Sequence, residues 1–240
     1  MPGGSVPRPY NPETVRRAVL FGVVLSTLLI TACASKEVQL RFALQVISQP
    51  EKAQVRFRGR PIGDAPKDID VRTYADLDAI VASLEGMNVV EKRLRILSPE
   101  RAQLIFKFGN QTELSPLARN LGVEKVLIFD YSEKVAFDVD KFDLKPEFLP
   151  LLNTQSDILT VHFPRAQIYV CGYTDSTGTD EHNLGLSLKR AQGVADYLIA
   201  RGVEKTRVQI RGFGKDYPVE SNTTTAGRAL NRRTEVVLPQ

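Results

Sequence analysis

Residues 167–201 read QIYVCGYTDSTGTDEHNLGLSLKRAQGVADYLIAR and predict a strand, a polar loop and a long helix. Residues 167–173 are rich in β-branched and aromatic side chains, which favours the strand. Residues 184–200 repeat apolar side chains on one helical face, and Gly202 is a typical residue at a helix end. The loop between the two elements contains Asp175 beside glycine and hydroxyl residues. This setting is suited to presenting a carboxylate to a ligand.

The flanking segments extend this unit into a complete fold. The additional elements expected here are a strand at 134–139, a helix at 146–159, and strands at 208–210 and 234–238. The resulting order, β-α-β-α-β-β, is typical of a two-layer α/β sandwich with a mixed sheet. We therefore assign residues 133–240 to one domain, and we expect residues from about 130 onward to fold alone.

Residues 33–132 carry a different mixture of signals and predict a small α+β domain of unknown function, which gives the whole chain an α+β class. Within it, residues 58–66 (RGRPIGDAP) predict a turn-rich loop. The other elements expected in this region are strands at 38–46, 53–57, 89–97, 102–108 and 126–129, and helices at 73–84 and 114–121.

Four ordered motifs of the second domain carry a family resemblance. They are residues 172–178 (GYTDSTG), 183–194 (NLGLSLKRAQGV), 212–214 (GFG) and 227–233 (GRALNRR). In this order and spacing they resemble the OmpA C-terminal-like domain, which outer-membrane protein A, the peptidoglycan-associated lipoprotein and flagellar stator proteins share. The resemblance implies non-covalent binding of peptidoglycan through the meso-diaminopimelate of its stem peptide, with no cofactor and no metal. Tyr173 departs from the family, which more often has His at this position.

The chemistry of this ligand explains which side chains a site would need. Diaminopimelate carries an ammonium and a carboxylate on one carbon, so its recognition requires one fixed anion and one fixed cation. Arginine suits the carboxylate because its guanidinium forms two parallel hydrogen bonds. By resemblance, Asp175 binds the ligand ammonium and Arg190 binds the ligand carboxylate. The resemblance also implies further binding residues, which are Thr174, Asn183, Leu186, Phe137, Asp138 and an additional cation, Arg232.

Structural roles remain open for several of these side chains. Asp175 and Arg190 together would also fit a surface ion pair, which contributes little to stability. The other open alternatives are core packing for Phe137 and Leu186, a turn position for Asp138, a strand cap or a pair with Glu235 for Arg232, and ordinary loop positions for His162 and His182.

The N-terminus has the pattern of an export signal. Arg16 and Arg17 precede an apolar run at residues 18–32, which is shorter than the ~20 residues of a membrane-spanning helix. The run ends in Ile-Thr-Ala-Cys33, which resembles the bacterial lipobox. The resemblance implies that residues 1–32 are a lipoprotein signal peptide and that Cys33 carries fatty acyl chains such as palmitate. Ala34 follows, not Asp, which favours the outer membrane with the protein facing the periplasm. An ordinary signal peptide or short anchor with an incidental Cys is the alternative.

Composition argues against several function classes. The 240-residue chain is 42% apolar and 25% charged, as globular proteins are. Its net charge of +4 shows no basic surplus of the kind that nucleic-acid binding requires. Two Cys and two His are too few for a zinc site built from these residues. Cys171 lies in a predicted strand and is expected to be a buried thiol.

Three functions are considered. A peptidoglycan-cleaving enzyme is not expected, because the sequence shows no Ser or Cys nucleophile paired with a His base. The favoured function is a lipid-anchored protein that ties the outer membrane to the cell wall. The alternative is a wall-anchored subunit of an envelope assembly, in secretion or motor machinery, in which residues 36–132 dock a protein partner.

Overall fold

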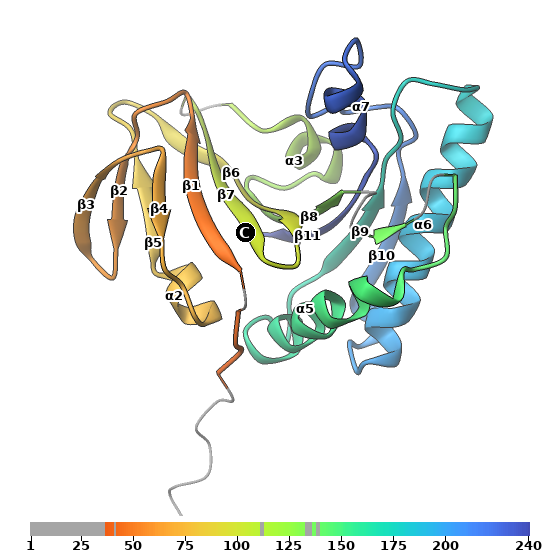
Figure 1. The fold of residues 1–240 in the computed structure, drawn as a ribbon, viewed down its shortest axis with the longest axis horizontal. Coiled ribbons are helices and arrows are strands. Elements are labelled where there is room, and N and C mark those ends of the chain that lie inside the picture. The colour runs from red at the N-terminus through yellow and green to blue at the C-terminus, as the bar shows by residue number, and fades with distance from the viewer. Residues whose placement is uncertain (1–36, 41, 111–112, 133–135, 138–139) are drawn as a thin grey trace, which may run out of the picture. The chain divides into compact units, whose positions relative to one another are not determined.

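An eight-stranded mixed sheet organises the part of the chain that the computed structural model describes, namely residues 37–40, 42–110, 113–132, 136–137 and 140–240 (Figure 1). In order across the sheet, the strands are β10 (Val208–Gly212), β9 (Ile168–Gly172), β11 (Arg233–Pro239), β8 (Val126–Ser132), β6 (Asn88–Ser98), β7 (Arg101–Gly109), β1 (Ala43–Gln49) and β4 (Lys67–Ile69). The pairs β10–β9, β8–β6 and β7–β1 are parallel, and the other neighbours are antiparallel.

A smaller antiparallel sheet and several helices complete the described part. The smaller sheet has the order β3 (Arg60–Asp64), β2 (Gln54–Phe57) and β5 (Ile80–Ser83). The helices are α2 (Tyr74–Asp78), α3 (Pro116–Leu121), α5 (Leu149–Val161), α6 (Asp180–Ala200) and α7 (Thr225–Asn231), with 3-10 turns at Pro146–Phe148 and Lys205–Arg207. At the starts of α3, α6 and α7 the side chains of Ser115, Thr179 and Thr224 accept hydrogen bonds from backbone N–H groups of the first turn.

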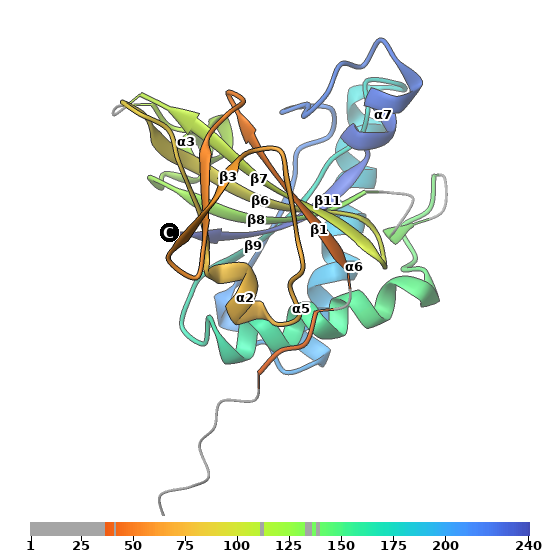
Figure 2. The same cartoon turned by 60° about the vertical axis from the view of Figure 1, so that its left-hand side comes forward.

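One hydrophobic cluster extends along one face of the large sheet. Leu94 of β6 and Phe129 of β8 are buried in it together with Leu152 of α5 and Leu198 of α6. α5 and α6 pack against each other on this face, as Figure 1 and Figure 2 show. The smaller sheet adds Val55 to the same cluster. Full burial of a large apolar side chain contributes about 1.5–3 kcal/mol, so this shared cluster stabilises both halves of the chain together.

The opposite face of the sheet buries charged side chains, because successive residues of a strand point to opposite faces. Arg93 on β6 lies at their centre, with its Nε 2.9 Å from Glu91 Oε1. Its Nη1 is 3.0 Å from Asp130 Oδ2 and 2.5 Å from Glu235 Oε1. Glu235 Oε1 also accepts a hydrogen bond from Nε of Arg233 at 2.7 Å. We call these five residues the sheet network; it links β6, β8 and β11.

The α+β class and most of the expected elements are confirmed. The expected strands 167–173, 208–210 and 234–238 correspond to β9, β10 and β11, and the expected helix 146–159 corresponds to the 3-10 turn and α5. The expected strand 134–139 lies largely outside the described residues, and within it Phe137 forms an isolated bridge with Leu144. β8, which was expected to end at residue 129, continues to Ser132 and is the strand that pairs with β11.

The boundary expected after residue 132 falls directly at the end of β8. This strand is hydrogen-bonded on one side to β11 and on the other to β6, so that Phe129 lies opposite both Val236 and Leu94. Residues 37–240 form one compact unit. The two expected halves therefore share a continuous sheet. Independent folding from about residue 130 onward stays an untested prediction. Because such a fragment cuts through β8, we now expect independent folding only of a fragment that begins before Val126.

Two expectations for local structure are wrong. Residues 73–84 form the short α2 followed by β5, in which buried Ile80 and Ala82 alternate with exposed neighbours. The spacing of apolar residues predicted a helix, but residues 80–83 pair with β2 as a strand, in which buried and exposed side chains alternate with a period of two. Residues 58–66 do not form a loop: a turn with Gly59 at a φ of 76° leads into β3, which pairs with β2.

The predicted signal peptide and Cys33 lie outside the described residues. Within residues 37–240, as far as they are described, no helix is both long and apolar enough to cross a membrane. Cys171 is buried with a free thiol, as expected, and burial raises the pKa of that thiol. A buried, protonated thiol is chemically inert.

Candidate functional site

Two glycines let α6 lie directly against the sheet. A Cβ on Gly172, at the end of β9, would be 1.9 Å from the carbonyl oxygen of Ser187 in α6. A Cβ on Gly212, at the end of β10, would be 2.9 Å from the backbone nitrogen of Leu188. Only glycine permits such a close approach of two backbones. The first half of α6 is thereby fixed beside the loop that follows β9.

That loop is held by its own side chains. The hydroxyl of Thr179 caps α6 by accepting a hydrogen bond from the backbone N–H of His182 at 3.2 Å. Nδ2 of Asn183 donates to the carbonyl oxygen of Thr177 at 2.8 Å. The backbone N–H of Thr177 donates to Oδ1 of Asp175 at 2.8 Å, and the Thr177 hydroxyl donates to the same oxygen. The carboxylate of Asp175 is therefore held in one orientation.

Asp175 is buried yet ionised. Its side chain is 6% exposed, and its Oδ2 accepts a hydrogen bond from Nη1 of Arg232 at 2.7 Å. Burial alone would raise the pKa of Asp175, but the hydrogen bonds from Thr177 and Arg232 outweigh burial and hold the pKa below its usual value. A carboxylate has about four acceptor positions. The three donors described here leave room for a further donor such as a ligand ammonium.

Arg190 approaches the same region from α6. It is buried, and its Nε donates to the carbonyl oxygen of Lys141 at 2.9 Å. Its guanidinium lies over the ring of Phe137, 5.1 Å from the ring centroid. A hydrogen bond at one edge and an aromatic ring at one face together orient the planar guanidinium.

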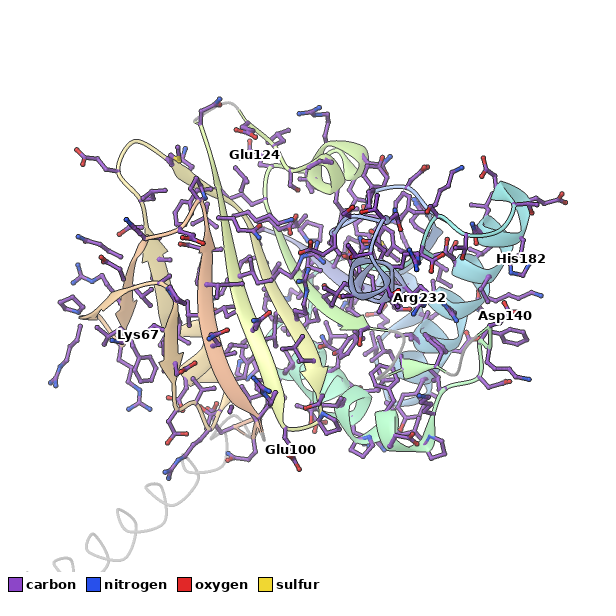
Figure 3. All side chains as sticks on the ribbon, turned by 45° about the horizontal axis from the view of Figure 1, so that its top comes forward. Lys67, Glu100, Glu124, Asp140, His182 and Arg232 are labelled. Atoms are coloured by element: carbon purple, nitrogen blue, oxygen red, sulfur yellow. The ribbon has the colours of Figure 1, made fainter. Side chains whose placement is uncertain are left out.

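A cavity of about 350 Å³ lies between the loop and α6; we call it the Asp175 cavity. Six of the eight predicted binding residues line it, namely Thr174, Asp175, Asn183, Leu186, Arg190 and Arg232. Asp140, Thr177, Gly178 and His182 complete the lining. Figure 3 labels Asp140, His182 and Arg232, which come from three separate segments of the chain. The lining of this small volume therefore contains two carboxylates, of Asp140 and Asp175, and two guanidinium groups.

The other two predicted binding residues do not line the cavity. Phe137 is buried at 2% exposure beneath Arg190, so it supports the cation from the core. Asp138 lies outside the described residues. The alternative of a surface pair between Asp175 and Arg190 is wrong, because both residues are buried and Asp175 is paired with Arg232.

One of the two alternatives for Arg232, a pair with Glu235, is wrong, whereas the other, a cap of the last strand, is compatible with its position directly before β11. Glu235, considered above as its partner, is bound by Arg233 of the sheet network, whereas Arg232 turns to the cavity. Tyr173, the departure from the family pattern, is fully buried. Its ring stacks on Phe213 at 5.3 Å between centroids, and the guanidinium of Arg233 lies 3.7 Å from its centroid. Tyr173 therefore lies outside the cavity lining.

Sequence reasoning missed two residues at the cavity edge. His182 was expected to be an ordinary loop residue, but it lies in the first turn of α6 and lines the cavity. Its Nε2 is 3.3 Å from Oδ1 of Asp140. Asp140 has a φ of 58°, a conformation that Asp adopts more readily than most residues. Pairing across 42 positions leaves no periodic signal in the sequence.

Sequence reasoning also missed α7, within what was expected to be a long loop. Oδ1 of Asn222 accepts hydrogen bonds from the backbone N–H of Ser176 at 3.2 Å and from Nδ2 of Asn231 at 3.0 Å. Asn231, at the end of α7, thereby supports the Asp175 loop from behind. A usable signal was present, because Thr224 is a good N-cap residue and Ala and Arg follow it.

Comparison with known proteins identifies this region. The OmpA family matches residues 136–232. This segment is an OmpA-like domain. The resemblance read from the four motifs is therefore confirmed for the second half of the chain. The described part of the protein contains no group of three or more His, Cys, Asp or Glu side chains able to hold a metal ion.

Three proteins illustrate the similarity of the OmpA-like domain. Probable lipoprotein YiaD of Escherichia coli (strain K12) is 38% identical over 112 residues, which is 47% of this chain and 51% of that protein. Peptidoglycan-binding protein ArfA of Mycobacterium tuberculosis is 43% identical over 104 residues, which is 43% of this chain and 32% of that protein. The solved structure of the peptidoglycan-associated lipoprotein from Burkholderia pseudomallei has 35% identity and a TM-score of 0.41, over 43% of this chain and 87% of that chain. The chain spans about half or less of the two curated relatives.

Proposed function

We propose that this chain is a lipid-anchored outer-membrane protein that binds peptidoglycan non-covalently and tethers the membrane to the cell wall. The observation that carries the proposal is the Asp175 cavity, where an ionised carboxylate and the guanidinium of Arg190 line the same 350 Å³. We propose no catalytic step. Two relatives support this function by their names, since ArfA is called a peptidoglycan-binding protein and YiaD a probable lipoprotein.

The ligand group we propose is the zwitterionic end of diaminopimelate. Its ammonium binds Asp175, which stays charged because its pKa is held low, and its carboxylate binds Arg190. Arg232 neutralises part of the charge on Asp175 when the cavity is empty of ligand. Leu186 provides an apolar surface for the methylene chain of the ligand. Desolvated charge pairs of this kind give specificity, because a ligand that lacks one charge leaves a buried partner unpaired.

Co-sedimentation with purified sacculi tests this function. Asp175→Asn keeps the shape of the side chain and removes its charge, and Arg190→Lys keeps the charge and removes the bidentate geometry. Asp175→Asn should weaken binding by roughly 30-fold or more, since breaking one side of a desolvated charge pair costs about 2–5 kcal/mol. Arg190→Lys should weaken binding less, because the charge is kept and only the paired hydrogen bonds are lost. Asp180→Asn is the matched control, because Asp180 is exposed on the same helix and does not line the cavity.

Two results would contradict the proposed site. One is wild-type binding by both variants, with circular dichroism showing that both are folded. The other is equal loss of binding in the Asp180→Asn control. Circular dichroism is required here, because Asp175 and Arg190 are both buried and their replacement affects packing as well as charge.

The membrane anchor is a separate part of the proposal and has its own test. The motif Ile-Thr-Ala-Cys33 after a short apolar run motivates it. Cells that express the wild-type chain should incorporate a fatty-acid analogue into the protein, and Cys33→Ser should abolish the label and leave an uncleaved precursor. Equal labelling of the wild-type protein and the Cys33→Ser variant would contradict lipid attachment at Cys33.

The first half of the chain suggests a second candidate function. Residues 37–132 lie outside the matched family segment, yet they supply β1, β4, β6, β7 and β8 of the large sheet and all of the smaller sheet. A simple tether does not require these additional folded residues. As the alternative, we therefore propose that the chain is a wall-anchored subunit of an envelope assembly. Cross-linking of the full chain in cells distinguishes the two, because a reproducible protein partner through residues 37–132 is expected only for the assembly subunit.

A further inference from the structure

We propose that a second cavity beside the first binds a sugar ring of the glycan strand, and that Phe142 is its stacking platform. This proposal rests on the proposed function. The second cavity has a volume of about 440 Å³, and we call it the Phe142 cavity. Its lining residues are Asp140, Phe142, Thr179, Glu181, His182, Gly185, Leu186 and Lys189. Asp140, His182 and Leu186 also line the Asp175 cavity, so the two are adjacent.

Phe142 is unusual because it is a large aromatic side chain at the surface. It is 45% exposed, and an exposed large apolar side chain at a cavity is more informative than a buried one. Nζ of Lys189 lies 5.2 Å from the centroid of the ring, which is within the range of a cation–π contact. A Cβ on Gly193 would lie 3.4 Å from the Phe142 carbonyl oxygen, so the backbone at this point also packs against α6.

The chemistry around the ring fits a sugar. A pyranose has one face of C–H groups, which packs on an aromatic ring, and a rim of hydroxyls that need hydrogen-bond partners. The rim finds acceptors in the carboxylates of Asp140 and Glu181, and a donor in the ammonium of Lys189. A stem-peptide residue with a free carboxylate fits less well, because two carboxylates face one ammonium in this lining.

The two cavities are adjacent, because they share three lining residues. On α6 the Asp175 cavity uses Asn183, Leu186 and Arg190, and the Phe142 cavity uses the neighbouring row of Gly185 and Lys189. The two rows lie side by side on a helix whose diameter is about 10–12 Å. Two residues of the stem peptide lie between the sugar and diaminopimelate, and they span about 7 Å at ~3.3–3.6 Å per extended residue. One ligand molecule is therefore long enough to occupy both cavities.

Gly185 provides a clean way to fill the Phe142 cavity. Apart from its chain neighbours and the nearby backbone of α6 itself, no protein atom lies within 4 Å of a Cβ built on Gly185, so a new side chain there has room to enter the cavity. Replacement of an exposed helical glycine is also tolerated by the backbone, because glycine is itself a poor helix former. Gly185→Gln therefore blocks the cavity while the fold is kept. Leu184→Gln is the matched control: Leu184 is exposed on the same helix and lines neither cavity.

The test measures two affinities for each variant by isothermal titration calorimetry, on the full chain in detergent. The probes are the free diaminopimelate tripeptide and the same tripeptide attached to its disaccharide. In the wild type, the disaccharide should improve affinity about threefold to tenfold, the range expected for one aromatic contact. Phe142→Ala and Gly185→Gln should abolish this improvement, whereas Phe142→Trp and Leu184→Gln should keep it.

The outcomes separate this inference from the proposed function. Equal wild-type affinity for the two probes overturns the sugar site and leaves peptide binding intact. A loss in Phe142→Ala that is the same for both probes assigns the Phe142 cavity to the peptide and also overturns it. Failure of the wild type to bind either probe overturns the proposed function and this inference together.

Discussion

Two buried clusters of arginine and carboxylate side chains in the described part of the protein differ in what they face. In the sheet network, Arg93 contacts Glu91, Asp130 and Glu235, and the arginine side chain is 3% exposed. In the Asp175 cavity, Asp175 contacts Arg232, whose side chain is 26% exposed. The first cluster is enclosed by protein, and the second lines a cavity.

This difference separates stability from binding. An ion pair enclosed by protein affects the stability of the fold, because removing one partner leaves the other charge buried without a counter-charge. A charge beside a cavity keeps part of its interaction capacity for a ligand. Each cluster also has its own place in the chain: the sheet network joins β6 of the first half to β11 of the second, whereas the cavity is built from the OmpA-like domain.

The largest expected effect comes from cutting the chain directly after β8, which removes the strands of the first half from β11. The fragments 133–240 and 124–240 both lack Arg93, but only the fragment of residues 133–240 lacks β8, so that β11 loses the strand with which it pairs along its whole length. We expect this fragment to show no cooperative unfolding by circular dichroism. A fragment of residues 124–240 keeps β8 and should unfold cooperatively. Cooperative unfolding of 133–240, together with its sedimentation on sacculi, would restore the boundary expected from the sequence.

The next effect is a loss of stability from Arg93→Ala. Three carboxylates lose their shared cation, and breaking a buried ion pair costs about 3–5 kcal/mol. Urea denaturation of the full chain measures this loss. Arg101→Ala on β7 is the control, because Arg101 is exposed and surface substitutions usually change stability by less than about 0.5 kcal/mol. A loss below about 1 kcal/mol for Arg93→Ala would show that the sheet network does not support the fold.

Acid should act through the sheet network as well. Burial alone would raise the pKa of Glu235, but Arg233 and Arg93 outweigh it and lower that pKa to about 2. A carboxyl group with a lowered folded pKa stabilises the protein above its unfolded pKa of about 4.5, and this contribution is lost as the pH falls toward 2. Urea midpoints should therefore decline across this window. The Glu235→Gln variant should decline less, and parallel curves for the two proteins would contradict this role of Glu235.

The smallest expected effect on stability is that of Arg232→Gln. Arg232 also pairs with a buried carboxylate, but a quarter of its side chain is exposed, and water replaces much of the lost interaction. Partly exposed ion pairs contribute about 1 kcal/mol or less. The same urea measurement compares Arg232→Gln with Arg93→Ala directly. Equal losses in the two variants would remove the distinction between the clusters.

Several of the predicted binding residues lie together in the structure because they are close together along the chain. Asp175, Asn183 and Arg190 lie on one loop and one helix, where spacing alone brings side chains together. The sequence did not predict that Arg232 pairs with Asp175 across 57 positions, nor that Asp140 lies beside His182. Such pairs depend on the sheet order, which leaves no periodic pattern in the sequence.

The sheet network was missed for a related reason. Charged residues on alternate positions of β6 look like the solvent-facing side of a half-exposed strand. In the structure these positions are buried, because β8 and β11 bring carboxylates to Arg93. The two-domain expectation failed to anticipate this, since it placed the partners in separate sheets.

The central claim is that the Asp175 cavity recognises both charges of diaminopimelate, and one comparison of ligands tests it most directly. Calorimetry measures the affinity for two stem tripeptides, one with diaminopimelate and one with lysine in its place. Lysine keeps the side-chain ammonium and lacks the second carboxylate. The account predicts that the wild type binds the lysine peptide roughly 30-fold or more weakly, and that Arg190→Gln removes most of this difference. Equal wild-type affinity for the two peptides would contradict the claim.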